Sequence, residues 1–202
     1  FFRELFIWGE IQTDPNFGNY RIRIAGEEGA NSETDQIVLL DFGAVQAYSA
    51  TFLDPVVQMI RASYEGDLTE VIDGGIRLRF MSEDWPDDVL DTFGKVCMSV
   101  LEPLSRDRSN WPGEAVNDRG QYRWKQSDLP SRVARQAARS AISRYFKVPP
   151  KEFVFLNRKL IGVYTFIAVL NAEFNGEDLL REYLYGDPGT PDASSTNQMT
   201  KP

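Results

Sequence analysis

Hydrophobic periodicity changes character once along this chain, and the change restricts the folds open to it. Residues 20–24 have the sequence Y-R-I-R-I, an alternation typical of a half-buried strand, and the run I-V-L-L at 37–40 predicts a more deeply buried one. The polar, turn-rich stretch between them predicts a hairpin with a long loop over residues 20–40. From about residue 50 onward the apolar spacing is helical. The sequence therefore predicts a mainly α fold with a small β-hairpin, in the α+β class.

Capping patterns predict where the helices begin and end, because acidic N-caps start a helix and glycine ends one. They predict helix starts at Asp54-Pro55 and at Asp67 with Glu70, and helix ends at Gly9 and Gly74-Gly75. Further helices are predicted over about 86–101, 128–146 and 150–174, with a long loop over 103–125.

Length and composition predict one folded domain. A chain of 202 residues buries roughly 70% of its unfolded surface when it folds as a single domain. Residues 1–185 are predicted to form this domain. Residues 186–202 contain too few apolar side chains to fold, so a disordered tail is expected there.

Composition also excludes several kinds of site. The chain contains no histidine, which excludes histidine-based triads and metal sites. Its single cysteine, Cys97, cannot form an internal disulfide or a thiolate cluster, which suits a reducing compartment. A net charge of −8 argues against a nucleic-acid partner held by general charge. The longest apolar run, residues 160–170, is shorter than the ~18 residues of a membrane span, so a buried helix is predicted there.

Two motifs near the start place two carboxylates and an amide at a spacing that phosphoryl transfer uses. Residues 12–19 are Q-T-D-P-N-F-G-N, in which Asn19 follows Asp14 by five positions, and the segment Asp41-Phe42-Gly43 ends the apolar run. A protein kinase holds its nucleophile and Mg²⁺ with a loop Asp, an Asn five residues later, and the Asp of a following D-F-G. The order, the spacing and the predicted hairpin agree with that arrangement. Ordinary turn chemistry at the same residues is the alternative.

Two charged clusters are interpreted as structural. Arg132, Arg135 and Arg139 share one helix face by their spacing, and a solvated stripe is favoured over a site for phosphate or a lipid head group. The acidic residues between 83 and 88 complement a helix N-terminus, which is favoured over a metal site.

The motifs also resemble those of a known family. Q-T-D-P-N-F-G-N followed by L-L-D-F-G-A is similar to the UbiB-like (AarF/ADCK) atypical protein-kinase-like family, which is associated with ubiquinone (coenzyme Q) biosynthesis. The segment V-P-P-K-E at 148–152 and the L-N-R-K-L-I-G helix after it are similar to the helical end of that family. The resemblance covers residues 1 to about 185.

The resemblance implies a role for each motif residue. Asp14, in a catalytic loop over 12–19, would be the catalytic carboxylate, and Asn19 and Asp41 would hold Mg²⁺ on bound ATP. Phe42 would pack beneath the site, and Gly43 would let the backbone turn. Many members have D-P-H-P-G-N, so the N-F at positions 16–17 departs from the family pattern.

The resemblance further implies a kinase-like C-terminal lobe whose small lobe is absent from this chain. The sequence has neither G-x-G-x-x-G nor G-x-x-x-x-G-K-[ST], nor the family's K-x-G-Q segment, and we expect these to precede Phe1. The expected partners are that missing lobe, and quinone-biosynthesis proteins or a lipid. The intact parent would be an ATP-dependent phosphotransferase or ATPase in a cytoplasmic or matrix-like reducing compartment, free or peripheral at a membrane, whereas this fragment alone is not expected to be active. A catalytically silent, pseudokinase-like scaffold that binds a protein or lipid is the alternative.

Overall fold

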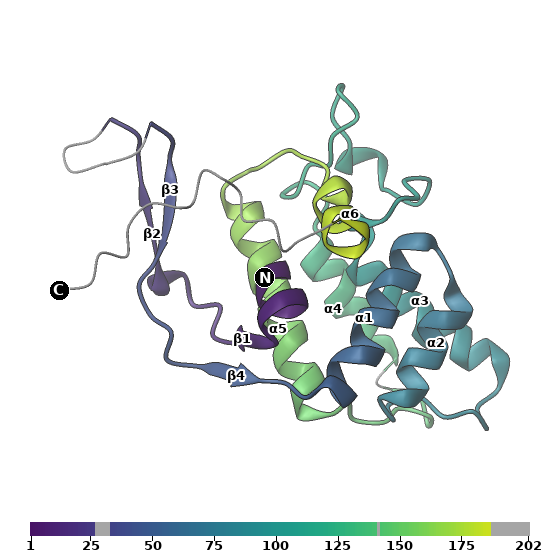
Figure 1. Cartoon of the computed structure of the whole chain (residues 1–202). Coiled ribbons are helices and arrows are strands. Elements are labelled where there is room, and N and C mark those ends of the chain that lie inside the picture. The colour runs from purple at the N-terminus through teal and green to yellow at the C-terminus, as the bar shows by residue number, and fades with distance from the viewer. Residues whose placement is uncertain (27–32, 141, 187–202) are drawn as a thin grey trace.

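The computed structural model of the chain describes residues 1–26, 33–140 and 142–186. Its body is helical, with α1 at Ala50–Glu65, α2 at Leu68–Arg77, α3 at Asp87–Val100, α4 at Leu129–Ser140, α5 at Lys151–Val169 and α6 at Glu177–Tyr185. Helix α5 stands between the strands on one side and α1–α4 on the other (Figure 1). The α+β class predicted from the sequence is confirmed. The predicted disordered tail lies outside the described residues, except for Gly186.

Two antiparallel strand pairs lie beside the helical body. Strand β2 at Tyr20–Arg23 pairs with β3 at Gln36–Leu39, which confirms the predicted hairpin. Strand β1 at Glu10–Gln12 pairs with β4 at Val45–Ala47, a pair that the sequence did not predict. Three residues are too few to show a period-2 pattern.

The hairpin is more exposed than predicted. Ile22 is 46% exposed, Ile37 59% and Leu40 53%, so the run I-V-L-L is not a deeply buried strand. Figure 1 shows the reason, because most of the hairpin extends away from the helical body, and Tyr20 at the start of β2 packs on α5.

Of the predicted boundaries of α1 and α2, two are wrong and one is confirmed. Helix α1 begins after Ser49, so Pro55 lies inside it. Gly74 lies inside α2 and does not end it. Helix α1 packs so closely at this point that an added Cβ would overlap Met59, which explains the glycine. The capping pattern at the start of α2 is confirmed, since the Asp67 side chain accepts a hydrogen bond of 3.1 Å from the Glu70 N–H.

The first turns of the chain form a short π-type helix at Glu4–Trp8. It ends at Gly9, whose φ of +65° lies in the left-handed region that favours glycine, so the predicted stop is confirmed. Helices α4 and α5 are both shorter than predicted, and α6 was not predicted.

The segment predicted as a long loop contributes to the core. It contains two short 3-10 turns, Glu102–Leu104 and Gly113–Ala115, and it buries Tyr122 and Trp124. Glu102 in this segment receives a bidentate pair of hydrogen bonds, at 2.6 and 2.9 Å, from the guanidinium of Arg132. Arg132 therefore stabilises this segment and is not part of a solvated stripe.

Candidate functional site

The two polar ends of the first motif are in contact. The motif follows β1, and its last residues form a 3-10 turn at Phe17–Asn19 in which the Asn16 side chain accepts from the Gly18 N–H at 3.0 Å. This turn brings the Asn19 amide back toward Asp14, and Asn19 Nδ2 donates to Asp14 Oδ2 at 3.2 Å. The five-residue spacing thus corresponds to a direct side-chain contact.

The D-F-G segment is fixed beside this loop by backbone hydrogen bonds on both flanks. Before it, the Leu40 N–H donates to the Asn19 carbonyl at 2.7 Å. After it, the Ala44 carbonyl accepts from both the N–H and the hydroxyl of Thr13, each at 2.9 Å. Asp41 lies between these two attachments, so the backbone of the D-F-G segment runs beside the loop at residues 12–19.

One face of α5 supports the loop from below. Arg158, Gly162 and Phe166 are four residues apart, which places them on one face of the helix. The Arg158 guanidinium lies 3.3 Å from Asp14 Oδ1. Gly162 lies against Pro15, and the ring of Phe166 packs on those of Phe17 and Tyr20 at centroid distances of 5.8 and 5.2 Å. A β-carbon at position 162 would overlap Pro15, so glycine is required for this approach.

A buried polar network fixes the residue at the start of the loop. Lys159 is only 4% exposed, and its Nζ donates to Gln12 Oε1 at 2.9 Å and lies 3.6 Å from Glu4 Oε2. Gln12 links Lys159 to the loop, because its Nε2 donates to the backbone carbonyl of Asp14 at 2.7 Å. Helix α5 thus holds the loop through both a surface ion pair and a buried amide.

Comparison with known proteins gives concordant matches. Residues 1–74 match the family described as ABC1 atypical kinase-like domain. The chain is 28% identical over 191 residues to the atypical kinase coq-8, mitochondrial, of Caenorhabditis elegans, which covers 93% of the chain and 23% of that protein. It is 26% identical to the atypical kinase COQ8B, mitochondrial, of Rattus norvegicus, over 89% of the chain and 30% of that protein.

The chain is similar to the UbiB-like atypical kinase family. A third relative, the probable serine/threonine-protein kinase abkA of Dictyostelium discoideum, is 26% identical over 85% of the chain and 28% of its own length. The UbiB-like chain therefore spans between about a quarter and a third of the length of these relatives. Among its described residues, no helix is long and apolar enough to cross a membrane.

The donor atoms of this UbiB-like site suit Mg²⁺. Because the Asn19 amide nitrogen is directed to Asp14, its oxygen is left for a ligand. Oδ1 of Asp41 accepts from the Gly43 N–H at 2.7 Å, and the other carboxylate oxygen has no hydrogen bond within the described part of the chain. Mg²⁺ prefers one or two carboxylate or carbonyl oxygens together with phosphate and water. Among the described residues, no three acidic or cysteine side chains are placed so that they could hold a metal ion together, and a Mg²⁺ site with phosphate and water as ligands does not need three.

Phe42 does not pack beneath the site in this chain. Its side chain is 64% exposed, because no described residue covers that side of the hairpin. It borders a cavity of about 560 Å³ between the strands and α5, which Tyr20 and Lys159 also line. Burial raises the pKa of Tyr20, and the nearby carboxylates of Glu4 and Asp14 raise it further, so this phenol stays protonated at neutral pH.

The sequence analysis missed the residues that support the loop. Arg158 and Lys159 were quoted only within the helix motif, and neither was given a role. Gln12 and Thr13 belong to the first motif, but the spacing argument did not use them. The one available signal was a lysine next to an arginine inside an otherwise apolar helix, since a lysine is rarely buried unless it is paired.

Proposed function

We propose that this chain is the C-terminal lobe of a kinase-like UbiB protein that binds Mg-ATP. In the intact parent, Asn19 and Asp41 hold Mg²⁺ against the nucleotide phosphates, and Asp14 orients or deprotonates the attacking hydroxyl or water. The reaction supports ubiquinone or related lipid-quinone metabolism in a reducing compartment, and the names of its relatives, mitochondrial atypical kinases, favour this setting.

One observation carries the proposal. Asp14 and Asn19 are in contact, and the backbone bond between Leu40 and Asn19 brings the start of the D-F-G segment to the same point. Asp41 directly follows a residue whose backbone is bonded to Asn19, and this closeness of the three motif residues in the fold supports the proposal. An interaction module has no physical need for this combination, because its polar residues need only face water.

The division of roles follows from the surroundings of each carboxylate. Both oxygens of Asp14 are engaged by Asn19 and Arg158, which fixes the orientation of the carboxylate. Asp41 has no cationic partner among the described residues and keeps one oxygen open. A metal cation is the natural counter-charge for an open carboxylate, so Asp41 is assigned to the metal and Asp14 to the nucleophile.

The test is Mg²⁺-dependent ATP binding by calorimetry, together with phosphate release, in the full-length parent. We expect Asp41→Asn to lower both binding and turnover, and Asp14→Asn to leave binding within about twofold while turnover falls on the order of 10²-fold or more. Asp35→Asn, on the other end of the same hairpin, is the matched control and should change neither. Unchanged turnover in Asp41→Asn would refute the assignment.

A catalytically silent scaffold is the second candidate. The observation that favours it is the ion pair between Asp14 and Arg158, which places a positive charge on the proposed catalytic carboxylate. Turnover of the parent separates the two functions. If the parent is a scaffold, its phosphate release is at background both before and after Asp14→Asn, while binding of a partner protein or lipid persists.

The exposed apolar side chains of the hairpin suggest where the missing lobe of the parent docks. Ile37, Leu40 and Phe42 are each more than half exposed and lie next to the proposed nucleotide site. A contiguous exposed apolar surface marks an interaction site. We expect amide hydrogen exchange in residues 36–40 to be slower in the parent than in this chain. Equal exchange rates would argue against docking at this face.

A further inference from the structure

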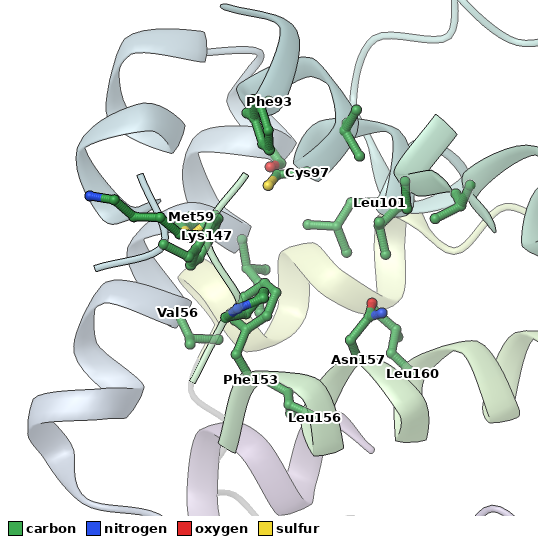
Figure 2. Close-up of a pocket in the computed structure, with 18 of the residues that line it drawn as sticks. Val56, Met59, Phe93, Cys97, Leu101, Lys147, Phe153, Leu156, Asn157 and Leu160 are labelled. Carbon is green, nitrogen blue, oxygen red and sulfur yellow. The ribbon is translucent and has the colours of Figure 1, made fainter. Parts of the chain in front are cut away.

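A second cavity, lined almost entirely by apolar side chains, lies within the helical body. It has a volume of about 230 Å³, is partly open to solvent, and is lined by α1, α3, α4 and α5 and by the segment before α5. Figure 2 shows Val56 and Met59 on one side, Phe93, Cys97 and Leu101 on another, and Phe153 to Leu160 below. Protein interiors are close-packed and have few voids larger than a water molecule. This partly open space between four helices is larger than such voids, and its apolar lining is typical of a ligand pocket.

The polar groups of this cavity are few and distinct. Its polar side chains are Ser63, Asn157 and Lys147. The Asn157 side chain projects into the space, toward the side from which Cys97 enters (Figure 2). It makes no hydrogen bond with any residue in the described part of the chain. The side chain is half-buried, so its amide is available to form a hydrogen bond with a ligand in this space.

Each cationic group at the cavity is directed elsewhere, and the α-amino group of Phe1 lies 3.6 Å from Glu4 Oε2. Lys147 lines it with its aliphatic stem, and its amino group points away in Figure 2 and lies 5.4 Å from the centre of the Trp85 ring. Cys97 also faces the apolar space, and burial raises the pKa of its thiol to about 12, so it carries no charge at neutral pH. A charged head group would therefore lose its hydration without gaining a partner.

We propose that this cavity binds a small neutral amphiphile, a hydrocarbon with one hydroxyl or carbonyl group, whose polar end pairs with Asn157. An apolar cavity of ~150 Å³ accepts benzene, so this larger one takes a molecule of roughly eight to ten carbon atoms. Binding sites of this kind combine an apolar lining with a few polar groups that fix orientation. The site lies on the far side of α5 from the catalytic loop, and the proposal does not depend on the nucleotide site.

The probe is 1-octanol, titrated calorimetrically into the full chain, with octanoate as the charged analogue of equal length. We expect 1-octanol to bind at least tenfold more tightly than octanoate at pH 8. Equal affinity, or tighter binding of octanoate, would overturn the neutral head group. Absence of 1-octanol binding up to its solubility would overturn the site itself.

Two variants locate the ligand. Asn157→Leu should weaken 1-octanol binding about fivefold, the value of one hydrogen bond of ~1 kcal/mol, and should leave binding of toluene, which has no polar group, within twofold. Cys97→Phe fills the cavity and should abolish binding of both. Lys95→Met, at an exposed position of the same helix, is the control and should change neither. Loss of toluene binding in Asn157→Leu would indicate a collapsed cavity and overturn the assigned role of the amide.

The last measurement is 1-octanol binding to the full-length parent. Phe1 lines the cavity, so binding to this chain and to the parent is compared. Retention of 1-octanol binding in the parent, with the same loss in Cys97→Phe, supports the site. Loss of binding in the parent would overturn the proposal, because the cavity would then be filled by the parent's own side chains.

Discussion

Replacement of Lys159 by methionine removes the charge at the centre of the buried network beneath the loop. The side chain is 4% exposed, its Nζ lies 2.9 Å from Gln12 Oε1 and 3.6 Å from Glu4 Oε2, and methionine fills most of the space of its aliphatic stem. Removing one partner of a buried ion pair typically costs ~3–5 kcal/mol, because the other charge is left unpaired. The amino group of Phe1 remains 3.6 Å from Glu4 Oε2. We therefore expect a loss at the lower end of this range, about 3 kcal/mol.

The assay is urea unfolding followed by far-UV circular dichroism, with the free energy of unfolding extrapolated to water at constant slope. Addition of Glu4→Gln to the Lys159→Met variant removes the unpaired carboxylate and should restore at least ~1 kcal/mol. Lys95→Met is the matched control, because its exposed pair with Asp91 contributes ~1 kcal/mol or less. If Lys159→Met lowers the free energy of unfolding by less than ~1 kcal/mol, or if the double variant recovers none of it, Lys159 does not form a buried ion pair with Glu4.

Three further outcomes follow from individual side chains. Gly162→Ala places a methyl group against the catalytic loop and should lower the free energy of unfolding in urea by about 1–3 kcal/mol. In the control Gly113→Ala, the added Cβ meets nothing within 4 Å, and the loss should be ~0.5 kcal/mol or less. Equal losses would contradict the close packing at Gly162. Because burial raises the pKa of the Cys97 thiol to about 12, iodoacetamide at pH 8 should alkylate it at least ~100-fold more slowly in the folded chain than in urea, and a smaller ratio would indicate an accessible thiolate. Burial, and then the hydrogen bond to Glu177, raise the pKa of Tyr64 to about 12. Since the unfolded chain loses this proton near pH 10, the stability it contributes is complete below pH 10 and is lost as the pH rises toward 12. Tyr64→Phe should therefore flatten the fall of melting temperature over that interval, and an unchanged slope would contradict this linkage.

Local patterns predicted the elements whose cause is local. The alternation over residues 20–24 predicted β2, and the pair Asp67 and Glu70 predicted the start of α2, because side-chain spacing and capping act within a few residues. The prediction that the hairpin is buried was wrong. Apolar residues in a strand indicate a surface that is covered by another part of the protein, but the strand sequence does not identify that part. Gly74 was taken as a helix end for a related reason. Its position inside α2 is set by contact with α1, which sequence spacing does not contain.

The candidate site divides in the same way. Asp14, Asn19 and Asp41 were found because their chemistry requires a fixed spacing around a hairpin, and the roles given to them stay predictions. Arg158 and Lys159 contact Asp14 and Gln12 across separations of 144 and 147 residues. No window of sequence connects such residues. A single sequence predicts the groups that a reaction needs better than it predicts the groups that hold them in place.

Three consecutive residues of α5 link the two proposed sites. Successive side chains on an α-helix project about 100° apart, and here Asn157 enters the apolar cavity, Arg158 reaches Asp14 and Lys159 enters the buried network. A ligand that moved α5 at Asn157 would therefore displace two supports of the catalytic loop. Coupling of this kind is reciprocal for binding free energies. If 1-octanol changes the affinity of the parent for ATP, ATP must change the affinity for 1-octanol by the same factor. Asn157→Leu should bring this factor closer to one, whereas an unchanged factor would show that the two sites are not linked through Asn157.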